Sequence, residues 1–439
     1  MTTVRENEIL TRVGAGTPMG ELMRRYWIPA AISTELTADG DPVRLKLLGE
    51  ELIAFRDTDG RVGIMDHRCP HRCASLFFGR NEEGGLRCVY HGWKFNADGD
   101  CVDMANVPPH QDFKHKVHAK AYKTAERNGL IWVYMGDQAK IPALPAIPAT
   151  LRPTSDNKVW MAQRECNWLQ GMEGEMDTSH LGFLHLGKAH SGSGFMHDSQ
   201  RFAVAEKQPE YEYSDTEVGC MYGAYRPAPD GQTYWRIGHF ASPFWAMMPL
   251  MPIERCVIAR AYVPMDDTHT MILIVTGKPK GGTVDVFGEG EKIVGYSHNP
   301  VFVPNGSGFY DRWRLKANPA NDFFIDRAIQ RDQSFTGIDG VFSQDDMVTT
   351  SMGAISDRTF EHLGPSDLMI TRIRRRLINA AVALERDGTP PPGSDNPEAF
   401  AEVRSGNYVV NDKGREWVDT YREQMLRARA QLDFRQAAE

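Results

Sequence analysis

Cys69-Pro70-His71 and Cys88-Val89-Tyr90-His91 decide the fold of the first part of this chain, because each cluster pairs one cysteine with one histidine. A Rieske 2Fe–2S centre has two thiolates on one iron and two imidazoles on the other. Two facing loops, each offering one cysteine and one histidine, can therefore supply both irons. A Cys2His2 zinc site is the competing interpretation, but zinc fingers usually take a cysteine pair from one half and a histidine pair from the other. The mixed pairing favours the Rieske cluster.

The composition is that of an ordinary globular protein. The 439 residues include 41% hydrophobic and 25% charged residues, and a chain of this length has room for two or three domains. The net charge of −8 argues against a nucleic-acid or anionic-membrane partner. There is no apolar run of about 18 residues for a membrane span, and the polar first twelve residues argue against a secretory signal.

Seven cysteines are scattered along the chain. An odd and scattered set argues against a disulfide scaffold and for a reducing cytoplasm. Cys73 and Cys101 are expected to be buried free thiols, with a disulfide between them as the alternative.

A proline-rich run divides the chain near residues 145–150. Before it, a small antiparallel sandwich is predicted from short strands at residues 42–48, 51–57, 61–66, 85–90, 94–96 and 130–135. After it, strands are predicted at residues 159–166, 210–213, 218–226, 234–240, 255–263 and 269–276. Helices are predicted at residues 16–27, 167–185, 322–335, 343–352, 366–386 and 397–436. The fold class is α+β, with domains at residues 1–148 and 149–439.

A second metal constellation lies around residues 167–185. Asp177 and His180 are three residues apart and share a helix face. His180 and His185 are five apart, which on an ideal helix separates them by about 140°, so their convergence requires a helix end, a break or a π-bulge. A carboxylate from residues 342–348, with Asp345 as the candidate, would complete a 2-His-1-carboxylate triad that leaves open positions on Fe(II).

Six arginines in two of the predicted helices are interpreted as residues of solvent-exposed helix faces. These are Arg24 and Arg25 in the first predicted helix and Arg372, Arg374, Arg375 and Arg376 in a later one. Apolar residues Phe240, Phe244, Trp245, Met247 and Met248 are candidates to line a pocket beside the second metal, with core packing as the alternative.

Together these residues resemble the oxygenase component of Rieske non-haem iron ring-hydroxylating enzymes, and most closely the phthalate-dioxygenase-like branch. The likeness spans nearly the whole chain, including residues 22–29 and 351–364. It implies an N-terminal all-β Rieske domain followed by a helix-grip (START-like) catalytic domain with an antiparallel sheet and C-terminal helices. Glu173 is a departure from the naphthalene-type relatives, which carry an asparagine four residues before their bridging aspartate.

The resemblance also implies roles for the site residues. Its cluster motif matches Cys69, Cys88, His71 and His91, and its ligands for mononuclear Fe(II) match His180, His185 and Asp345. Asp346 is the alternative, because two adjacent acids leave the register open by one residue. Asp177 matches the family aspartate that bridges the two metal centres of neighbouring subunits, which implies a head-to-tail homotrimer or stacked hexamer.

The implied function is that of a terminal oxygenase that inserts dioxygen into the ring of an aromatic carboxylate, phthalate-like or phenoxybenzoate-like. The chain has no flavin or dinucleotide fingerprint, so electrons must come from a partner, by resemblance an NADH-dependent flavin/2Fe–2S reductase. Arg226, Arg236 and Arg260 are candidates to bind the carboxylate bidentately. The alternatives are a monooxygenase that performs O- or N-demethylation, and an electron-transfer or ligand-carrier protein without oxygenase chemistry.

Overall fold

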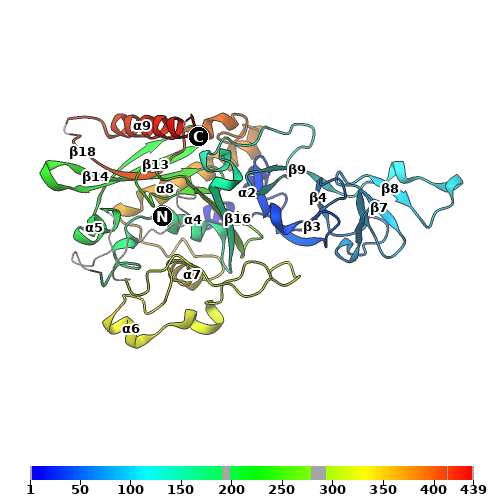
Figure 1. Cartoon of the computed structure of the whole chain (residues 1–439), viewed down its shortest axis with the longest axis horizontal. Helices are drawn as coiled ribbons and strands as arrows, with labels where there is room; N and C mark the ends of the chain where they lie inside the picture. The colour runs from blue at the N-terminus through cyan, green and yellow to red at the C-terminus, as the bar shows by residue number, and fades with distance from the viewer. Residues whose placement is uncertain (1, 190–197, 278–292, 413, 438–439) are drawn as a thin grey trace.

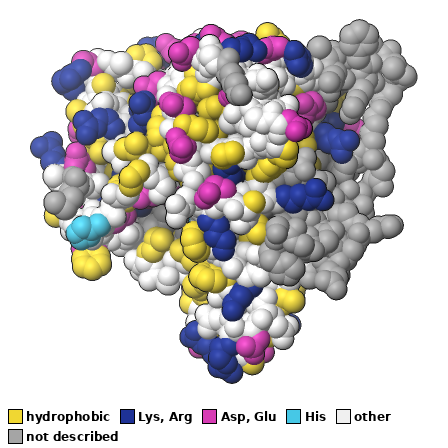
Figure 2. Space-filling view, turned by 90° about the vertical axis from the view of Figure 1, so that its left-hand side faces the viewer, with side chains coloured by type: hydrophobic (Ala, Val, Ile, Leu, Met, Phe, Trp, Pro, Cys, Tyr) yellow, Lys and Arg dark blue, Asp and Glu magenta, His cyan; other side chains and the backbone are white. Residues whose placement is uncertain are grey.

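The computed structural model describes residues 2–189, 198–277, 293–412 and 414–437. A small β-rich unit projects from one end of a larger body that holds both termini (Figure 1). The opposite end of that body has basic, acidic and apolar side chains interspersed over its surface (Figure 2). Within the described ranges, every helix lacks the length or the apolar character needed to cross a bilayer.

The projecting unit contains two antiparallel sheets, as the strand pattern predicted. The larger sheet has the order β1-β10-β9-β4-β3-β2, with β1 (Trp27–Ile32), β2 (Val43–Leu47), β3 (Glu50–Arg56), β4 (Val62–Asp66), β9 (Ala121–Arg127) and β10 (Leu130–Tyr134). The smaller sheet has the order β5-β6-β7-β8, with β5 (Arg80–Glu82), β6 (Gly85–Arg87), β7 (Trp93–Phe95) and β8 (Cys101–Met104). The cysteine–histidine clusters lie in the loops β4–β5 and β6–β7, beside a separate core that includes Phe55 and Phe95.

The larger body is built on one antiparallel sheet of the order β11-β17-β16-β15-β14-β13-β12, with β18 paired to β14. The strands are β11 (Asn157–Arg164), β12 (Glu210–Asp215), β13 (Gly219–Pro227), β14 (Thr233–Ala241), β15 (Trp245–Met247), β16 (Ile258–Pro264), β17 (Thr270–Gly277) and β18 (Gly406–Val410). This arrangement confirms the α+β class. The boundary at residue 148 stays a prediction.

Helices cover both faces of this sheet because successive side chains of a strand point to opposite sides. On β13, Cys220 and Tyr222 belong to the main core, which includes residues of α4 (Trp168–Met176) and α8 (Leu368–Asp387). Met221, between them, packs on the other face with Trp417 of α9 (Trp417–Ala437). The remaining α-helices are α1 (Val4–Thr11), α2 (Pro18–Met23), α3 (Pro148–Leu151), α5 (Asp198–Ala205), α6 (Arg327–Asp332) and α7 (Val341–Ser351).

The first predicted helix is shorter than residues 16–27. Thr17 caps α2 by accepting the amide of Gly20, and the helix ends before β1, whose six residues are all buried. Arg24 follows α2 and forms an ion pair with Glu50 at 2.8 Å, with its side chain 7% exposed. The prediction of a solvated face is therefore wrong for Arg24.

The prediction of one helix over residues 397–436 is also wrong. Strand β18 interrupts it, because residues 406–410 pair with β14 in the register Thr233↔Val410. Asp412 then accepts hydrogen bonds from the Thr233 hydroxyl and the Trp235 indole, both at 2.7 Å. Helix α9 begins only after this tertiary pairing is complete.

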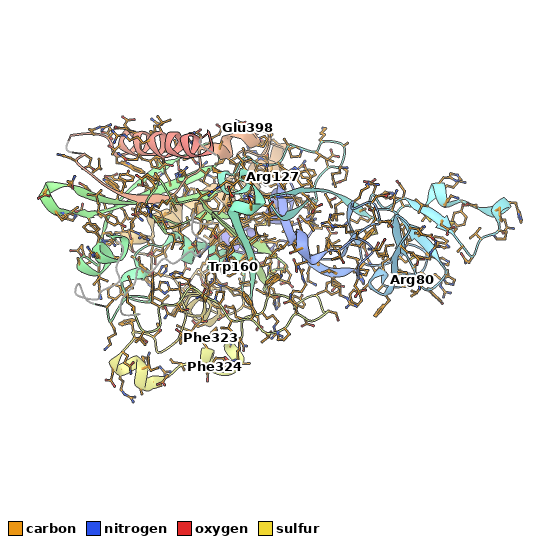
Figure 3. The ribbon with its side chains drawn as sticks, viewed as in Figure 1. Arg80, Arg127, Trp160, Phe323, Phe324 and Glu398 are labelled. Carbon is orange, nitrogen blue, oxygen red and sulfur yellow. The ribbon has the colours of Figure 1, made fainter. Side chains whose placement is uncertain are left out.

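The helix predicted at residues 322–335 is reduced to α6. Asp322, Phe323 and Phe324 have left-handed backbone conformations, with φ of 49°, 53° and 53°, which L-residues do not sustain as a helix. Asp326 then caps α6 by accepting the amides of residues 328 and 329. Phe323 and Phe324 lie in a lobe that projects away from the sheet (Figure 3).

All seven cysteines are free thiols. Cys101 is buried, as predicted, but Cys73 is exposed.

Candidate active site and cluster site

The two cluster loops have the same backbone conformation. In each loop the cysteine amide donates to the carbonyl five residues later, at 2.8 Å for Cys69 and for Cys88. The residue four positions after the cysteine closes each turn with positive φ, 60° at Cys73 and 77° at Gly92. Each turn returns its amide to the cysteine carbonyl, at 2.8 and 2.9 Å. The two loops bring their histidine rings together, with the imidazole planes 63° apart.

The donor set at the loop tips fits a Rieske cluster. Cys69 and Cys88 are buried, while the rings of His71 and His91 are half-buried with centroids 4.3 Å apart. Burial, opposed in part by a backbone hydrogen bond and reinforced by the other thiol, raises the pKa of Cys69 to about 12. His91 Nδ1 is a buried nitrogen with no hydrogen-bond partner among the described residues. Two thiols without a charged partner and an unpaired imidazole nitrogen are what a metal cluster would satisfy.

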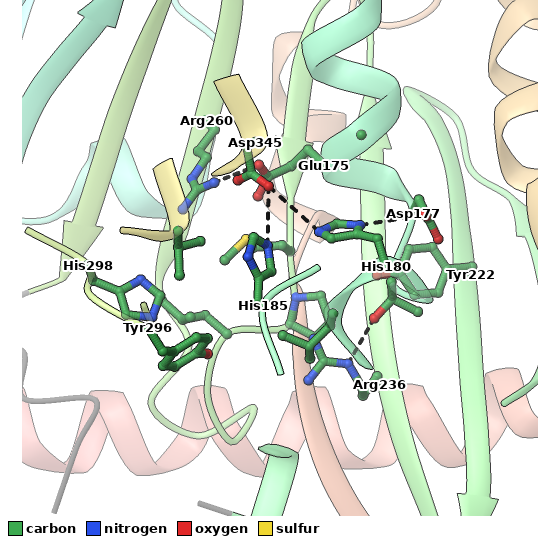
Figure 4. A pocket seen from close by; sticks show the side chains of 17 residues that line it. Glu175, Asp177, His180, His185, Tyr222, Arg236, Arg260, Tyr296, His298 and Asp345 are labelled. Carbon is green, nitrogen blue, oxygen red and sulfur yellow. Dashed lines mark hydrogen bonds and ion pairs between the residues drawn. The ribbon is translucent and has the colours of Figure 1, made fainter. Parts of the chain in front are cut away.

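The second constellation converges because helix α4 ends. Asp177 is the C-terminal cap of α4, and a 3₁₀ turn over His180–Gly182 follows. This change of direction brings His180 and His185 together with ring centroids 5.0 Å apart. Asp345 on α7 has its Oδ1 3.2 Å from His185 Nε2 and 3.9 Å from His180 Nε2 (Figure 4). One ligand atom from each of these three residues lies within 4.8 Å of the other two.

The two adjacent acids of α7 point to different surroundings. Asp345 faces the histidines; burial would raise its pKa, but the charges of His185 and His180 and the hydrogen bond to His185 lower it. Asp346 is 4% exposed, and its Oδ1 lies 3.9 Å from Arg164 Nε. Burial raises the pKa of Asp346 to about 7. Asp345 is therefore the acid placed to share a metal with His180 and His185.

Asp177 lies beside Nδ1 of His180, whereas Asp345 lies on the Nε2 side of the ring. The Oδ1 of Asp177 accepts the amide and the hydroxyl of Ser179, at 2.7 and 2.6 Å, and its Oδ2 is 3.5 Å from His180 Nδ1. Burial lowers the pKa of His180, but Asp177 and Asp345 outweigh it and raise the pKa to about 9. Asp177 can thus hold the orientation of the His180 ring.

A cavity opens beside His180, His185 and Asp345 (Figure 4). Its lining includes Tyr222, Arg236, Met248, Leu250, Tyr296, His298 and Val341. Among the five apolar residues predicted to line it, only Met248 does so, while Phe240, Phe244, Trp245 and Met247 belong to the core. Tyr296 and His298 were missed, because residues 278–321 show no periodic pattern that would indicate what they contact.

The three candidate arginines have different partners. Arg260 Nη1 donates to Glu175 Oε2 at 2.6 Å, and Tyr262 donates to the same oxygen at 2.6 Å. Arg236 lines the cavity and donates to the Thr178 hydroxyl at 3.0 Å. It forms no ion pair with a carboxylate of the described residues. Burial and the neighbouring Arg236 lower the pKa of Arg226 to about 10.

Helix α4 is anchored by a buried ion-pair network. Glu173 accepts from Arg374 Nε at 2.6 Å and Nη2 at 2.9 Å, and from Arg358 Nη2 at 3.2 Å. Glu361 accepts from Arg374 at 2.6 and 3.0 Å. The prediction of a solvated Arg374 is therefore wrong. The cause is a carboxylate 201 residues away in sequence.

Comparisons with known proteins agree with this architecture. Residues 26–122 match the Rieske [2Fe-2S] domain family, and residues 133–436 match the family described as LigXa C-terminal domain like. The chain is 45% identical to the 3-chlorobenzoate-3,4-dioxygenase oxygenase subunit of Comamonas testosteroni, over 97% of this chain and 99% of that protein. It is 38% identical to the phthalate 4,5-dioxygenase oxygenase subunit of Pseudomonas putida, over 95% and 94%.

A solved structure shares the fold. Dicamba monooxygenase bound to dicamba superposes with a TM-score of 0.54 at 18% identity, over 82% of this chain and 99% of that one. The family matches bear out the expected cofactors, a Rieske 2Fe–2S cluster and a mononuclear non-haem iron. The same matches identify the protein as an oxidoreductase of the oxygenase type. The chain belongs to the Rieske oxygenases, as an oxygenase subunit with a Rieske [2Fe-2S] domain and a LigXa-like catalytic domain.

Proposed function

We propose that this oxygenase acts on an aromatic carboxylate and that Arg236 binds the carboxylate of the substrate. The observation that carries the proposal concerns Arg236, which is 8% exposed, lines the cavity and has no ion pair with a described carboxylate. A buried charge without a counter-ion is costly, and a carboxylate can accept two parallel hydrogen bonds from such a group. The names of two relatives, which refer to 3-chlorobenzoate and phthalate, support this class of substrate.

The neighbouring arginines support the same choice. Arg226 lies on β13, two residues from the partner of Arg236 on β14 (Ala224↔Arg236), so both guanidinium groups project from one face of the sheet. The two like charges add to the positive potential at that wall. Arg260 is already neutralised by Glu175, which makes it a poorer candidate.

We assign the 2Fe–2S cluster to Cys69, Cys88, His71 and His91, and the mononuclear iron to His180, His185 and Asp345. When bound by these residues, the cluster would supply electrons one at a time and the mononuclear iron would supply open coordination positions for dioxygen.

The residues of the chain then have distinct tasks. Arg236 orients the ring of the substrate, and apolar residues such as Leu250 and Val341 exclude water from the cavity. Asp177 holds the His180 imidazole in place and links it to the electron donor.

We further propose a head-to-tail ring, a homotrimer or stacked hexamer, in which Asp177 contacts a Rieske histidine of the next subunit. Two features support it. Val89 and Tyr90, beside His91, are 59% and 53% exposed, and Asp177 and His180 line an open hollow together with Leu363. The electron donor would be an NADH-dependent flavin/2Fe–2S reductase. The cytoplasm is the proposed location, because all seven cysteines are unpaired.

The test is a substrate panel of benzoates, phthalates and phenoxybenzoates with their methyl esters, scored by product formation coupled to NADH consumption. Arg236→Met should raise the KM for the acids about 10- to 100-fold, the loss of a charge-assisted hydrogen bond of about 1.5–3 kcal/mol. Arg372→Met, at an exposed ion pair, is the matched control. Equal turnover of acids and esters, or an unchanged KM in Arg236→Met, would contradict the proposal.

Labelled dioxygen separates the alternatives. Two labelled atoms in a dihydrodiol product identify a dioxygenase, whereas one or none in a demethylated product identifies a monooxygenase. Three irons per chain support an oxygenase, and two would favour an electron-transfer or carrier protein.

A further inference from the structure

Gln344, immediately before Asp345 on α7, makes three hydrogen bonds in the interior. Its side-chain nitrogen donates to the carbonyls of Gly295 and Ile338, both at 2.9 Å. Its side-chain oxygen lies 2.6 Å from His185 Nδ1. The residue is 1% exposed, so water does not compete for these groups.

These bonds fix the orientation of the amide. Both N–H groups of Gln344 are already committed to carbonyl oxygens, and a flipped amide would place its oxygen against those carbonyls. The group that faces His185 is therefore an acceptor, and His185 Nδ1 must be the donor. A protonated His185 donates from Nε2 to Asp345 Oδ1, 3.2 Å away, whereas a neutral His185 keeps its proton on Nδ1 and has its lone pair on Nε2. Two acceptor atoms at this distance are stabilised by a cation between them.

The same residue is tied to the cavity wall. The Gly295 carbonyl, which accepts from Gln344, also accepts the amide of Gly340 at 3.1 Å, and the Ser297 carbonyl accepts the amide of Val341 at 2.9 Å. Residues 295–297 are thus joined to the start of α7. Tyr296, in the middle of this segment, lines the cavity.

We propose that Gln344 is a positioning residue that fixes His185 with Nε2 toward the metal and couples this ligand to the cavity wall at Tyr296. The inference rests on the proposed assignment of His185 as an iron ligand. Gln344 sets which nitrogen of His185 faces the metal and connects this ligand to the cavity wall.

Two substitutions of Gln344 distinguish its hydrogen bond to His185 from its hydrogen bonds to the carbonyls of Gly295 and Ile338. Gln344→Leu keeps a similar shape but removes the acceptor for His185 and both donors. Gln344→Glu keeps an acceptor for His185 and loses the paired donors to Gly295 and Ile338. Ser351→Ala is the matched control, because this exposed hydroxyl on α7 donates to the Val348 carbonyl at 2.7 Å, within the same helix.

The measurement is Fe(II) affinity of the protein after anaerobic removal of the mononuclear metal, with the Rieske paramagnetic resonance signal as the check on folding. Gln344→Leu should lower the affinity about 10- to 100-fold with the Rieske signal unchanged. Gln344→Glu should retain the affinity within a few-fold but raise the KM for substrate. Ser351→Ala should match the unaltered protein in both.

Unchanged Fe(II) affinity in Gln344→Leu would overturn the positioning role, and an unchanged KM in iron-loaded Gln344→Glu would overturn the link to the wall. If Gln344→Leu does not fold, a folded Gln344→Glu that loses Fe(II) affinity overturns the proposal on its own. His185→Ala distinguishes this failure from a failure of the proposed function, since intact Fe(II) binding in that variant would refute the ligand assignment itself.

Discussion

Replacement of Arg374 by methionine should destabilise the larger body much more than replacement of Arg372, two residues earlier on the same helix. The Arg374 side chain is 5% exposed and contacts Glu173 through two nitrogens. Methionine keeps much of the aliphatic volume but leaves the buried carboxylate with Arg358 alone, at 3.2 Å. Arg372 is 44% exposed and pairs with Asp215 at 3.3 Å.

The size of the effect follows from the burial of the partners. Removal of one partner from a buried ion pair costs about 3–5 kcal/mol, and the remaining Arg358 keeps the loss near the lower end. Glu361, whose side chain is 25% exposed, regains water and adds at most about 1 kcal/mol. We expect a total loss of about 3–4 kcal/mol for Arg374→Met, against about 0–1 kcal/mol for Arg372→Met.

Urea unfolding followed by tryptophan fluorescence measures this difference. With a slope of about 3 kcal/mol per molar urea, a loss of about 3 kcal/mol lowers the midpoint by about 1 M. The slope must be the same for both variants, because a changed slope would indicate a changed unfolding transition. Equal midpoints for Arg374→Met and Arg372→Met would refute the buried network and restore the interpretation of a solvated helix face.

Two further predictions concern the metal site and acid stability. Asp177→Asn should keep the Rieske signal and the mononuclear iron but lower turnover about 100-fold, because the His180 ring loses its charged partner; normal turnover would exclude the bridging role. His239 is 1% exposed, and burial lowers its pKa from 6.5 to about 3, so the unfolded chain binds a proton there that the folded chain does not, and stability falls as the pH drops from about 6.5 towards 3. Between pH 7.5 and pH 5 the protonation of His239 in the unfolded chain should lower the free energy of unfolding by about 2 kcal/mol. His239→Gln should lack this part of the pH dependence, so an equal pH dependence in both proteins would contradict the prediction.

Local spacing predicted those parts of the site that lie close together in sequence. The two cysteine–histidine clusters each fit within four residues, so the chemistry of the loop could be inferred before its conformation was known. The separation of His180 and His185 required a helix end, a break or a π-bulge, and the structure has the first of these, because α4 ends with Asp177 as its cap. Such inferences need only helix geometry and ligand preference.

Residues whose partners are distant in sequence could not be assigned in the same way. Arg374 has the pattern of a surface arginine, and only the packing of α8 beside α4 brings it to Glu173. Asp345 and Asp346 have the same chemistry, and the position of His185 alone distinguishes them. Strand β18 has ordinary β-branched residues but exists because β14 offers it a free edge. In each case tertiary contact outweighs local propensity.

The charges at the end of α4 support the proposed anionic substrate. Glu173, Glu175 and Asp177 lie at the C-terminal end of this helix, where the dipole disfavours negative charge, so each requires its own partner. Glu175, on the cavity side, forms an ion pair with Arg260. Glu173 is paired with Arg358 and Arg374. Asp177 also lines the cavity, and its carboxylate lies beside the His180 ring. Among the described residues that line the cavity, Arg236 then keeps a positive charge that no acid of α4 neutralises. A substrate that brings its own carboxylate completes the balance of charge, whereas a neutral substrate would leave a buried cation unpaired.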